Sequence, residues 1–342
     1  MSANKMSNDL FPKELGFIPI GHPATMMSKE SVRRAVEEFR VRPTDIIVST
    51  FAKTGTTLVI WICHLLRTGG NDDLDFEFLY DVVPWPLASW DMGYDPNING
   101  SQFFPRVFKS HLRMASVYRG CKYIVTIRDP GKTAISFYNF LIAKGVPLDV
   151  LKEDVSQFAV DTSFIKGRDG RASLFEYYQE YHILRDCPSV LVLVYEDLVK
   201  DMPTSIRMIA AFMGISDARK SNNIDGSSAA IDSSIRSASE VPQELVHKVA
   251  SMSTKEYMVK IITKFDEPYE RAKELGRAGD IRFLAPGAKV VLGSHPQKIN
   301  ETATEFLDQE WDKTMRPHGY ENYTAFAKTI RETNMDRFFK SL

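Results

Sequence analysis

A short stretch near residue 50 places one lysine, one glycine and three threonines between two apolar runs. These residues are Lys53, Thr54, Gly55, Thr56 and Thr57. If a strand ends before them and a helix begins within them, the connecting backbone points free N–H groups outward. Glycine lets that backbone approach a ligand, and the helix N-terminus adds partial positive charge. Together with the lysine charge and the hydroxyl donors, this arrangement predicts a cradle for a phosphate or a similar tetrahedral anion.

Other interpretations of this stretch remain open at this point. A capped helix beside a solvated lysine uses the same residue types, because threonine and glycine are common at helix starts. A Walker A loop places its lysine after the last glycine, whereas Lys53 precedes Gly55. The order disfavours a nucleotide-dependent phosphoryl transferase. That enzyme class and a non-catalytic nucleotide-binding module stay as alternatives.

A second cluster pairs Lys109 with His111 at the end of a predicted strand over residues 106–111. Residues two apart on a strand share a face. His111 can take a proton from an attacking hydroxyl, since its ordinary pKa lies near neutrality, and Lys109 can neutralise charge on a transferred group. Taken alone, the pair is better explained as a surface pair at a strand end.

A third cluster follows the buried run 121–127. Arg128 comes directly after that run, and Ser136 lies in the next predicted helix. The planar guanidinium can bind a phosphate through two parallel hydrogen bonds, and the serine can add a donor. The alternative is an ion pair between Arg128 and Asp129 or another carboxylate.

Buried strands alternate with helices along the chain. Predicted strands cover residues 44–50, 106–111, 121–127 and 189–195. Predicted helices cover residues 28–40, 56–68, 130–143, 174–186, 202–215 and 300–315. This order predicts an α/β fold with a central, mainly parallel sheet flanked by helices. Such sheets bind ligands at the carboxyl ends of their strands, where all three clusters fall.

Composition limits the remaining possibilities. Hydrophobic residues make up 44% and charged residues 25%, and the net charge is −1, so no overall field indicates a nucleic-acid or membrane partner. The three cysteines are far apart and show no metal-ligand or disulfide spacing. The first residues lack the apolar core of a signal peptide. We expect one domain over residues 1–342 in the cytoplasm, with an irregular arm over 1–27.

Four ordered motifs resemble the PAPS-dependent sulfotransferases, PAPS being 3′-phosphoadenosine 5′-phosphosulfate. "STFAKTGTT" is similar to the phosphosulfate loop of the cytosolic small-molecule branch, and "PRVFKSHL" to its segment with lysine and histidine. "VTIRDPGKTAISFYNF" is similar to the segment that binds the 3′-phosphate, and "VLVLVYEDLVKDMPTSIRMIAAFMGI" to the segment that begins Tyr-Glu-Asp. The match runs in order from about residue 39 to 214.

The resemblance implies a P-loop-like three-layer fold and sulfuryl transfer from PAPS, leaving PAP, without a metal. It implies that His111 is the general base and that Lys53 and Lys109 stabilise the transferred group. The implied donor-binding residues are Lys53, Thr54, Gly55, Thr56, Thr57, Arg128, Ser136 and Tyr195.

Several positions depart from the family pattern. Leu58 stands where the family often has an adenine-stacking tryptophan, and Thr254 and Met258 only loosely echo another adenine segment. The C-terminal Arg-Lys-Gly-x-x-Gly-x-Trp segment is absent, and Lys289 is our candidate for its missing cation. The family's dimerisation motif is also missing, which leaves a monomer or a homodimer. A divergent cap or loop region is expected over about residues 220–300.

An aromatic segment, residues 78–104, precedes the strand that carries Lys109. We expect it to be a long loop, and its aromatic residues suit either an acceptor pocket for a small molecule or anchors to the core. Its carboxylates, Asp91 among them, are expected to be solvated. The candidate acceptor-binding residues are Tyr80, Trp85, Trp90, Phe104 and His111.

Overall fold

The computed structural model describes residues 27–99, 102–143, 151, 154–161, 172–215, 237–266 and 297–339. Nearly all of the predicted arm over 1–27 therefore lies outside the described residues. Most of the predicted cap region over about 220–300 does so too, including Lys289.

Four parallel strands form the central sheet in the order β2-β1-β3-β4. They are β1 (Ile46–Ser49), β2 (Val107–Ser110), β3 (Lys122–Ile127) and β4 (Val190–Val194), each inside a predicted strand. Their β-branched runs suit strands that are buried on both faces. Because the strands are parallel, all four end at the same edge of the sheet.

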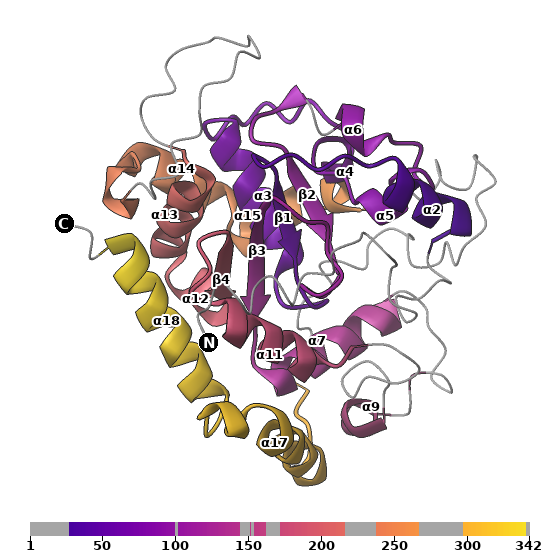
Figure 1. Cartoon of the computed structure of the whole chain (residues 1–342), viewed down its shortest axis with the longest axis vertical. Helices are drawn as coiled ribbons and strands as arrows, with labels where there is room; N and C mark the ends of the chain where they lie inside the picture. Colours follow the sequence, from indigo (N-terminus) through magenta and orange to yellow (C-terminus); the bar gives the residue numbers. More distant parts are fainter. Residues whose placement is uncertain are drawn as a thin grey trace.

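Helices cover both faces of the sheet, which gives three layers (Figure 1). One apolar core joins the first face to α3 (Thr56–Arg67), α13 (Met202–Met213) and α14 (Gln243–Met252). The other core joins the second face to α11 (Leu174–Leu184), α17 (Glu301–Thr314) and the first part of α18 (Tyr323–Phe339). Neighbouring strand residues alternate between the two cores, since Ile46 and Val48 enter the first and Ile47 the second. The predicted α/β three-layer fold is confirmed.

The remaining described α-helices are short or lie near the edges of the sheet. They are α2 (Lys29–Glu37), α4 (Leu79–Val82), α5 (Pro86–Ser89), α6 (Pro96–Asn99), α7 (Pro130–Ala143), α9 (Val155–Asp161), α12 (Tyr195–Lys200) and α15 (Lys255–Lys260). Among the described residues, no helix is long and apolar enough to cross a lipid bilayer.

A buried ion pair joins the amino ends of β1 and β2. Nε of Arg106 lies 2.8 Å from Oδ1 of Asp45, and Nη2 lies 2.5 Å from Oδ2. The two side chains are 3% and 0% exposed. Nη2 of Arg106 also donates to the carbonyl of Arg40, at 2.8 Å. The pair therefore ties the two strands to the chain that follows α2.

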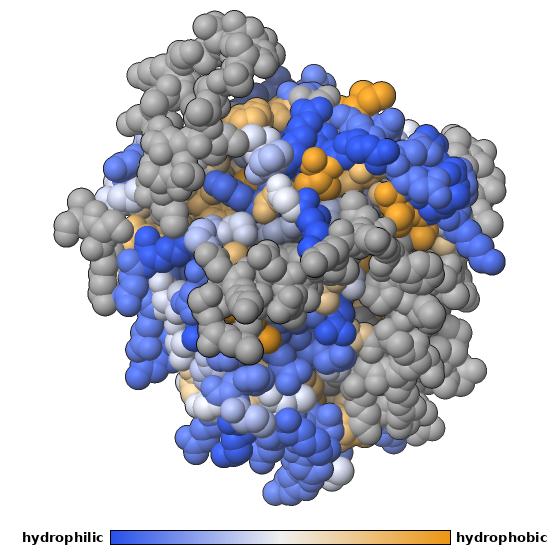
Figure 2. All heavy atoms as spheres, in the orientation of Figure 1, coloured by the Kyte–Doolittle hydropathy of each residue, from blue (hydrophilic) through white to orange (hydrophobic). Residues whose placement is uncertain are grey.

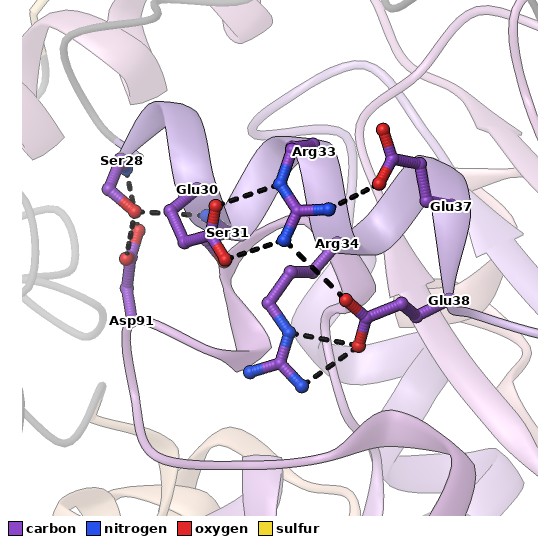
Figure 3. A network of polar contacts seen from close by, with 8 residues as sticks. All are labelled: Ser28, Glu30, Ser31, Arg33, Arg34, Glu37, Glu38 and Asp91. Carbon is purple, nitrogen blue, oxygen red and sulfur yellow. Dashed lines mark hydrogen bonds and ion pairs between the residues drawn. The ribbon is translucent and has the colours of Figure 1, made fainter.

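The aromatic segment is folded, which corrects the expectation of a long loop. It contains α4, α5 and α6, and α2 packs against it (Figure 3). The carboxylate of Asp91 is 6% exposed and accepts hydrogen bonds from the backbone and hydroxyl of Ser28, at 2.7 and 2.5 Å. The hydroxyl of Ser31 donates to the carbonyl of Leu87, at 2.8 Å. Asp91 is thus a structural anchor, and the prediction that it is solvated is wrong.

The exposed end of this segment carries large apolar residues. The upper right of Figure 2, where α4, α5 and α6 lie, shows small hydrophobic patches among hydrophilic atoms. Ile98 is 69% exposed and Phe104 is 57% exposed. This part of the segment is therefore available to apolar molecules from solvent.

Candidate active site

The carboxyl ends of the four strands each deliver one part of the predicted site. His111 follows β2, the anion loop (residues 50–57) follows β1, Arg128 follows β3 and Tyr195 follows β4. Contacts connect them in the order of the strands. Nδ1 of His111 lies 2.9 Å from the carbonyl of Thr50, and Nη1 of Arg128 donates to the carbonyl of Lys53 at 2.7 Å. The Arg128 guanidinium carbon lies 4.2 Å from the ring centroid of Tyr195.

The threonines of the anion loop hold its shape. The buried Thr54 hydroxyl lies 2.7 Å from the Thr126 hydroxyl and donates to the Phe51 carbonyl at 2.7 Å. The hydroxyls of Thr50 and Thr56 lie 2.5 Å apart. These bonds pin the loop to β3 and to the first turn of α3. The first amides of α3 have no acceptor inside the helix, as at any helix start.

Two residues of the loop have left-handed backbones. Lys53 has φ 68° and Gly55, the N-cap of α3, has φ 113°. A β-carbon added to Gly55 would lie 2.7 Å from Cδ2 of Tyr195. Both the backbone angle and the closeness of Tyr195 therefore require glycine at this position.

Gly55→Ala is expected to weaken PAP binding by about 5- to 150-fold, which corresponds to strain of about 1–3 kcal/mol. The methyl group must displace either the loop or the Tyr195 ring, and calorimetric titration with PAP would measure the loss. Gly69→Ala is the matched control, because Gly69 also has positive φ, 68°, but an added β-carbon meets nothing within 4 Å. Equal PAP affinities of the two variants would contradict this role of Gly55.

Arg128 is held from several sides but keeps unused hydrogen-bonding capacity. Its Nε is buried and has no hydrogen-bond partner among the described residues. No ion pair of Arg128 with Asp129 occurs in the described ranges, where the Asp129 carboxylate instead accepts from the Lys132 backbone at 2.8 Å. An orphaned buried N–H of a guanidinium can donate to a bound anion such as a phosphate.

Sequence analysis missed the residues that position Arg128. The Tyr178 hydroxyl accepts from the Arg128 amide at 3.2 Å and donates to the Arg128 carbonyl. The Glu196 carboxylate accepts from the Asp129 amide at 3.1 Å and from the Tyr323 hydroxyl at 2.6 Å. Burial raises the pKa of the Tyr178 and Tyr323 phenols, which keeps both hydroxyls protonated as donors. Glu196 lies in the Tyr-Glu-Asp motif, which is the one sequence signal that pointed to this network.

Lys53 contacts α7, the helix that carries Ser136. Nζ of Lys53 lies 4.3 Å from the ring centroid of Phe140. Ser136 precedes Phe140 by one helical turn, so both lie on the same face of α7. Ser136 is half-buried, and its side chain makes no hydrogen bond within the described part of the chain. The structure therefore brings the third cluster to the anion loop.

Lys109 and His111 share one aromatic neighbour. Nζ of Lys109 donates to the Tyr80 hydroxyl at 2.7 Å and lies 4.0 Å from the centre of the Trp85 ring. The rings of Trp85 and His111 meet edge to face, with centroids 5.3 Å apart. Tyr177 donates a hydrogen bond to the His111 carbonyl, at 2.7 Å. Two of the predicted acceptor residues, Tyr80 and Trp85, thus lie beside the predicted catalytic pair.

The chain belongs to a known enzyme family by sequence. The model of the sulfotransferase domain matches residues 43–274, which is more than half of the chain. The protein is a member of the sulfotransferase family. This result confirms the predicted enzyme, a PAPS-dependent sulfotransferase that acts on small molecules, and it sets aside both the phosphoryl transferase and the non-catalytic module.

The chain is similar to individual curated sulfotransferases and solved structures at moderate to low sequence identity. Sulfotransferase 2A6 of Rattus norvegicus is 31% identical over 211 residues, covering 59% of this chain and 71% of the relative. The 3-alpha-hydroxysteroid sulfotransferase of Cavia porcellus is 30% identical over 206 residues, covering 58% and 68%. A mouse sulfotransferase complexed with PAP has a TM-score of 0.56 at 18% identity, covering 90% and 95%. A retinol dehydratase with androsterone and PAP has a TM-score of 0.51 at 19% identity, covering 98% and 95%. These two structures share the fold of this sulfotransferase.

Other predicted residues of this sulfotransferase lie elsewhere or outside the described ranges. Trp90 packs under the Arg34 guanidinium of α2, at 4.9 Å from the ring centroid, and Phe104 is exposed. Thr254 caps α15 by accepting from the Tyr257 amide at 3.2 Å. Lys289 is not described. The structure gives Trp90 and Thr254 packing and capping contacts, and their proposed ligand contacts stay predictions.

Proposed function

We propose that this sulfotransferase transfers the sulfuryl group of PAPS to a hydroxyl or amine of a small, largely apolar acceptor, with His111 as the general base. The observation that carries the proposal is the row of contacts along the sheet edge. It joins His111 to the anion loop, the loop to Arg128, and Arg128 to Tyr195. A base and a set of anion-binding groups are thereby held in one rigid unit.

The position of His111 supports its role as base. A carbonyl oxygen only accepts hydrogen bonds, so its contact with Nδ1 places the proton of a neutral imidazole on Nδ1. Nε2 then carries the lone pair and can accept the proton of the acceptor's hydroxyl or amine. The Thr50 carbonyl selects this tautomer, and the Trp85 ring limits rotation of the imidazole.

The donor-binding residues are proposed from charge and placement. When bound, PAPS supplies the sulfuryl group for in-line transfer and leaves as PAP. The amides at Gly55, Thr56 and Thr57 and the Lys53 ammonium bind the 5′ side, where Lys53 and Lys109 neutralise charge as it develops. Arg128 and Ser136 bind the 3′-phosphate, and Tyr195 supports the Arg128 guanidinium.

The acceptor is proposed to lie against the aromatic segment, near Tyr80, Trp85 and the exposed Phe104. An apolar alcohol fits these residues, and one relative is named as a hydroxysteroid sulfotransferase. Trp90 stays a proposed acceptor-binding residue, although its ring packs against Arg34 of α2. We further propose a single domain over residues 1–342, a cytoplasmic location and a monomeric or homodimeric state.

Two measurements test the proposal. PAP and PAPS are expected to raise the melting temperature, whereas ATP with magnesium should leave it unchanged. Labelled sulfate from PAPS is then followed into a pooled library of phenols, alcohols and amines. Failure of PAP and PAPS to bind would contradict the donor site. Binding of PAP together with transfer only to charged, polar acceptors would contradict the apolar acceptor site.

A further inference from the structure

The ammonium group of Lys109 is held in an aromatic environment. Lys109 is 5% exposed, and its charge faces the ring of Trp85 and the ring and hydroxyl of Tyr80. An aromatic face attracts a cation most strongly when both are desolvated, and tryptophan attracts it best. The direction of this ammonium therefore depends on where the Trp85 ring lies as well as on the Tyr80 hydroxyl.

Trp85 contacts the second member of the catalytic pair as well. Its ring meets the His111 ring at an interplanar angle of 85°, edge to face. The side chain is 3% exposed, so it has little freedom to turn away. One buried indole thus touches both the proposed base and the proposed charge-neutralising lysine.

The backbone on either side of Trp85 is anchored independently. The Lys109 amide donates to the Pro84 carbonyl at 2.9 Å, so the residue before Trp85 is bonded to β2 itself. The Trp85 carbonyl accepts from the Ser89 hydroxyl at 2.8 Å and from the Ala88 amide at 2.9 Å. Farther along, α2 holds α5 through Ser31 and holds Asp91 through Ser28 (Figure 3).

The start of the segment has a further anchor on the opposite side. The half-buried Arg67 side chain of α3 donates to the Val82 carbonyl at 2.6 Å and to the Pro105 carbonyl at 3.1 Å. α3 begins at the anion loop, so one helix connects the donor side to the backbone that carries Trp85.

We propose that Trp85 is a positioning residue of the reaction, which sets Lys109 and His111 relative to each other through its indole ring. This inference rests on the proposed function of His111 and Lys109. This role differs from lining the acceptor pocket. A side chain that only lines the pocket changes the affinity for the acceptor and does not act through Lys109.

Kinetics separate these two roles. Trp85→Leu is expected to lower kcat by about 10- to 30-fold, the value of a desolvated cation–ring contact, with little change in the acceptor KM or in PAP affinity. Trp85→Phe keeps a weaker ring and should retain an intermediate kcat. In a Lys109→Met background, Trp85→Leu should lower kcat by a smaller factor than in the wild type, because only its effect through His111 remains and coupled substitutions are not additive.

Nuclear magnetic resonance of the protein without substrate tests this inference separately from the proposed function, because it does not depend on catalysis. The ring current of Trp85 should shift the Lys109 side-chain resonances upfield, and Lys109→Met assigns them by their disappearance. Long-range proton–nitrogen spectra report the His111 tautomer. Trp85→Leu should move both sets of signals, and Trp85→Phe should move them less.

Trp61→Phe is the matched control, since Trp61 is another fully buried tryptophan and lies in the other core. It should lower stability but leave the Lys109 and His111 signals and kcat unchanged. The inference is overturned if Trp85→Leu raises only the acceptor KM, or if the two substitutions combine additively. If Trp85→Leu does not fold, Trp85→Phe provides the test. The inference is then overturned if Trp85→Phe leaves both kcat and the Lys109 and His111 resonances unchanged.

Discussion

Replacing His111 with alanine is expected to lower kcat by about 10²- to 10⁴-fold, the usual contribution of a positioned general base. The affinity for PAP should stay within about 2-fold of the wild type, because His111 contacts the anion loop at the Thr50 carbonyl and the residues proposed to bind PAP are others. Single-turnover transfer of labelled sulfate, at saturating PAPS and acceptor, measures the chemical step directly. The loss should fall on that step and not on binding.

A control for this substitution is His247→Ala, at an exposed position on α14. It should leave transfer and PAP affinity unchanged. If His111→Ala also abolished PAP binding, the histidine would be holding the anion loop in shape, and the assignment as base would lose its support. Full activity of His111→Ala would contradict the assignment outright.

Arg106→Ala is expected to lower the free energy of unfolding by about 3–5 kcal/mol, the usual effect of removing one partner of a buried ion pair. The substitution leaves the Asp45 carboxylate buried, with the Arg42 amide as a remaining donor at 2.7 Å. It also removes the bond from Arg106 to the Arg40 carbonyl. Urea unfolding, followed by circular dichroism, measures the change.

The matched comparison combines Arg106→Met with Asp45→Leu. Replacing both partners by apolar residues removes the unpaired charge, so this double variant should lose less stability than Arg106→Ala. Arg33→Ala, in the exposed ion-pair network of α2, should leave the urea midpoint nearly unchanged (Figure 3). A double variant as unstable as Arg106→Ala would show that packing, and not charge, sets the cost.

β1, β3 and β4 could be predicted from sequence because each is a short, mainly apolar run that is buried on both faces, whereas β2 is half polar and was recognised as a short strand. The aromatic segment could not be predicted in the same way. Its helices α4, α5 and α6 have four residues each. Helices this short are not stable alone, so no helical periodicity marks them. Their structure depends on α2, whose Ser28 reaches Asp91 across 63 residues of sequence.

The residues of the candidate site also fall into those that could be predicted from sequence and those that could not. Lys53, His111 and Arg128 could be found because each lies at or within a few residues of the end of a recognisable strand, and strand order then brings them together. Tyr178 and Trp85 could not be given their observed positions, since each contacts the site through tertiary packing. Trp85 was expected near the acceptor, but nothing in the sequence indicated that its ring contacts both Lys109 and His111.

The Thr50 peptide has a consequence for redesign of this enzyme. Its carbonyl orients His111, its amide donates to the Ser110 carbonyl at 3.3 Å, and its hydroxyl meets Thr56. The base and the donor cradle therefore form one inseparable module, in which a change to either part disturbs the other. The aromatic segment is connected to α2 and to the end of α3, and through Tyr80 and Trp85 also to Lys109 and His111. Acceptor range is accordingly best changed by grafting residues 78–104 together with α2 while Tyr80 and Trp85 are kept, because these two side chains contact the catalytic pair.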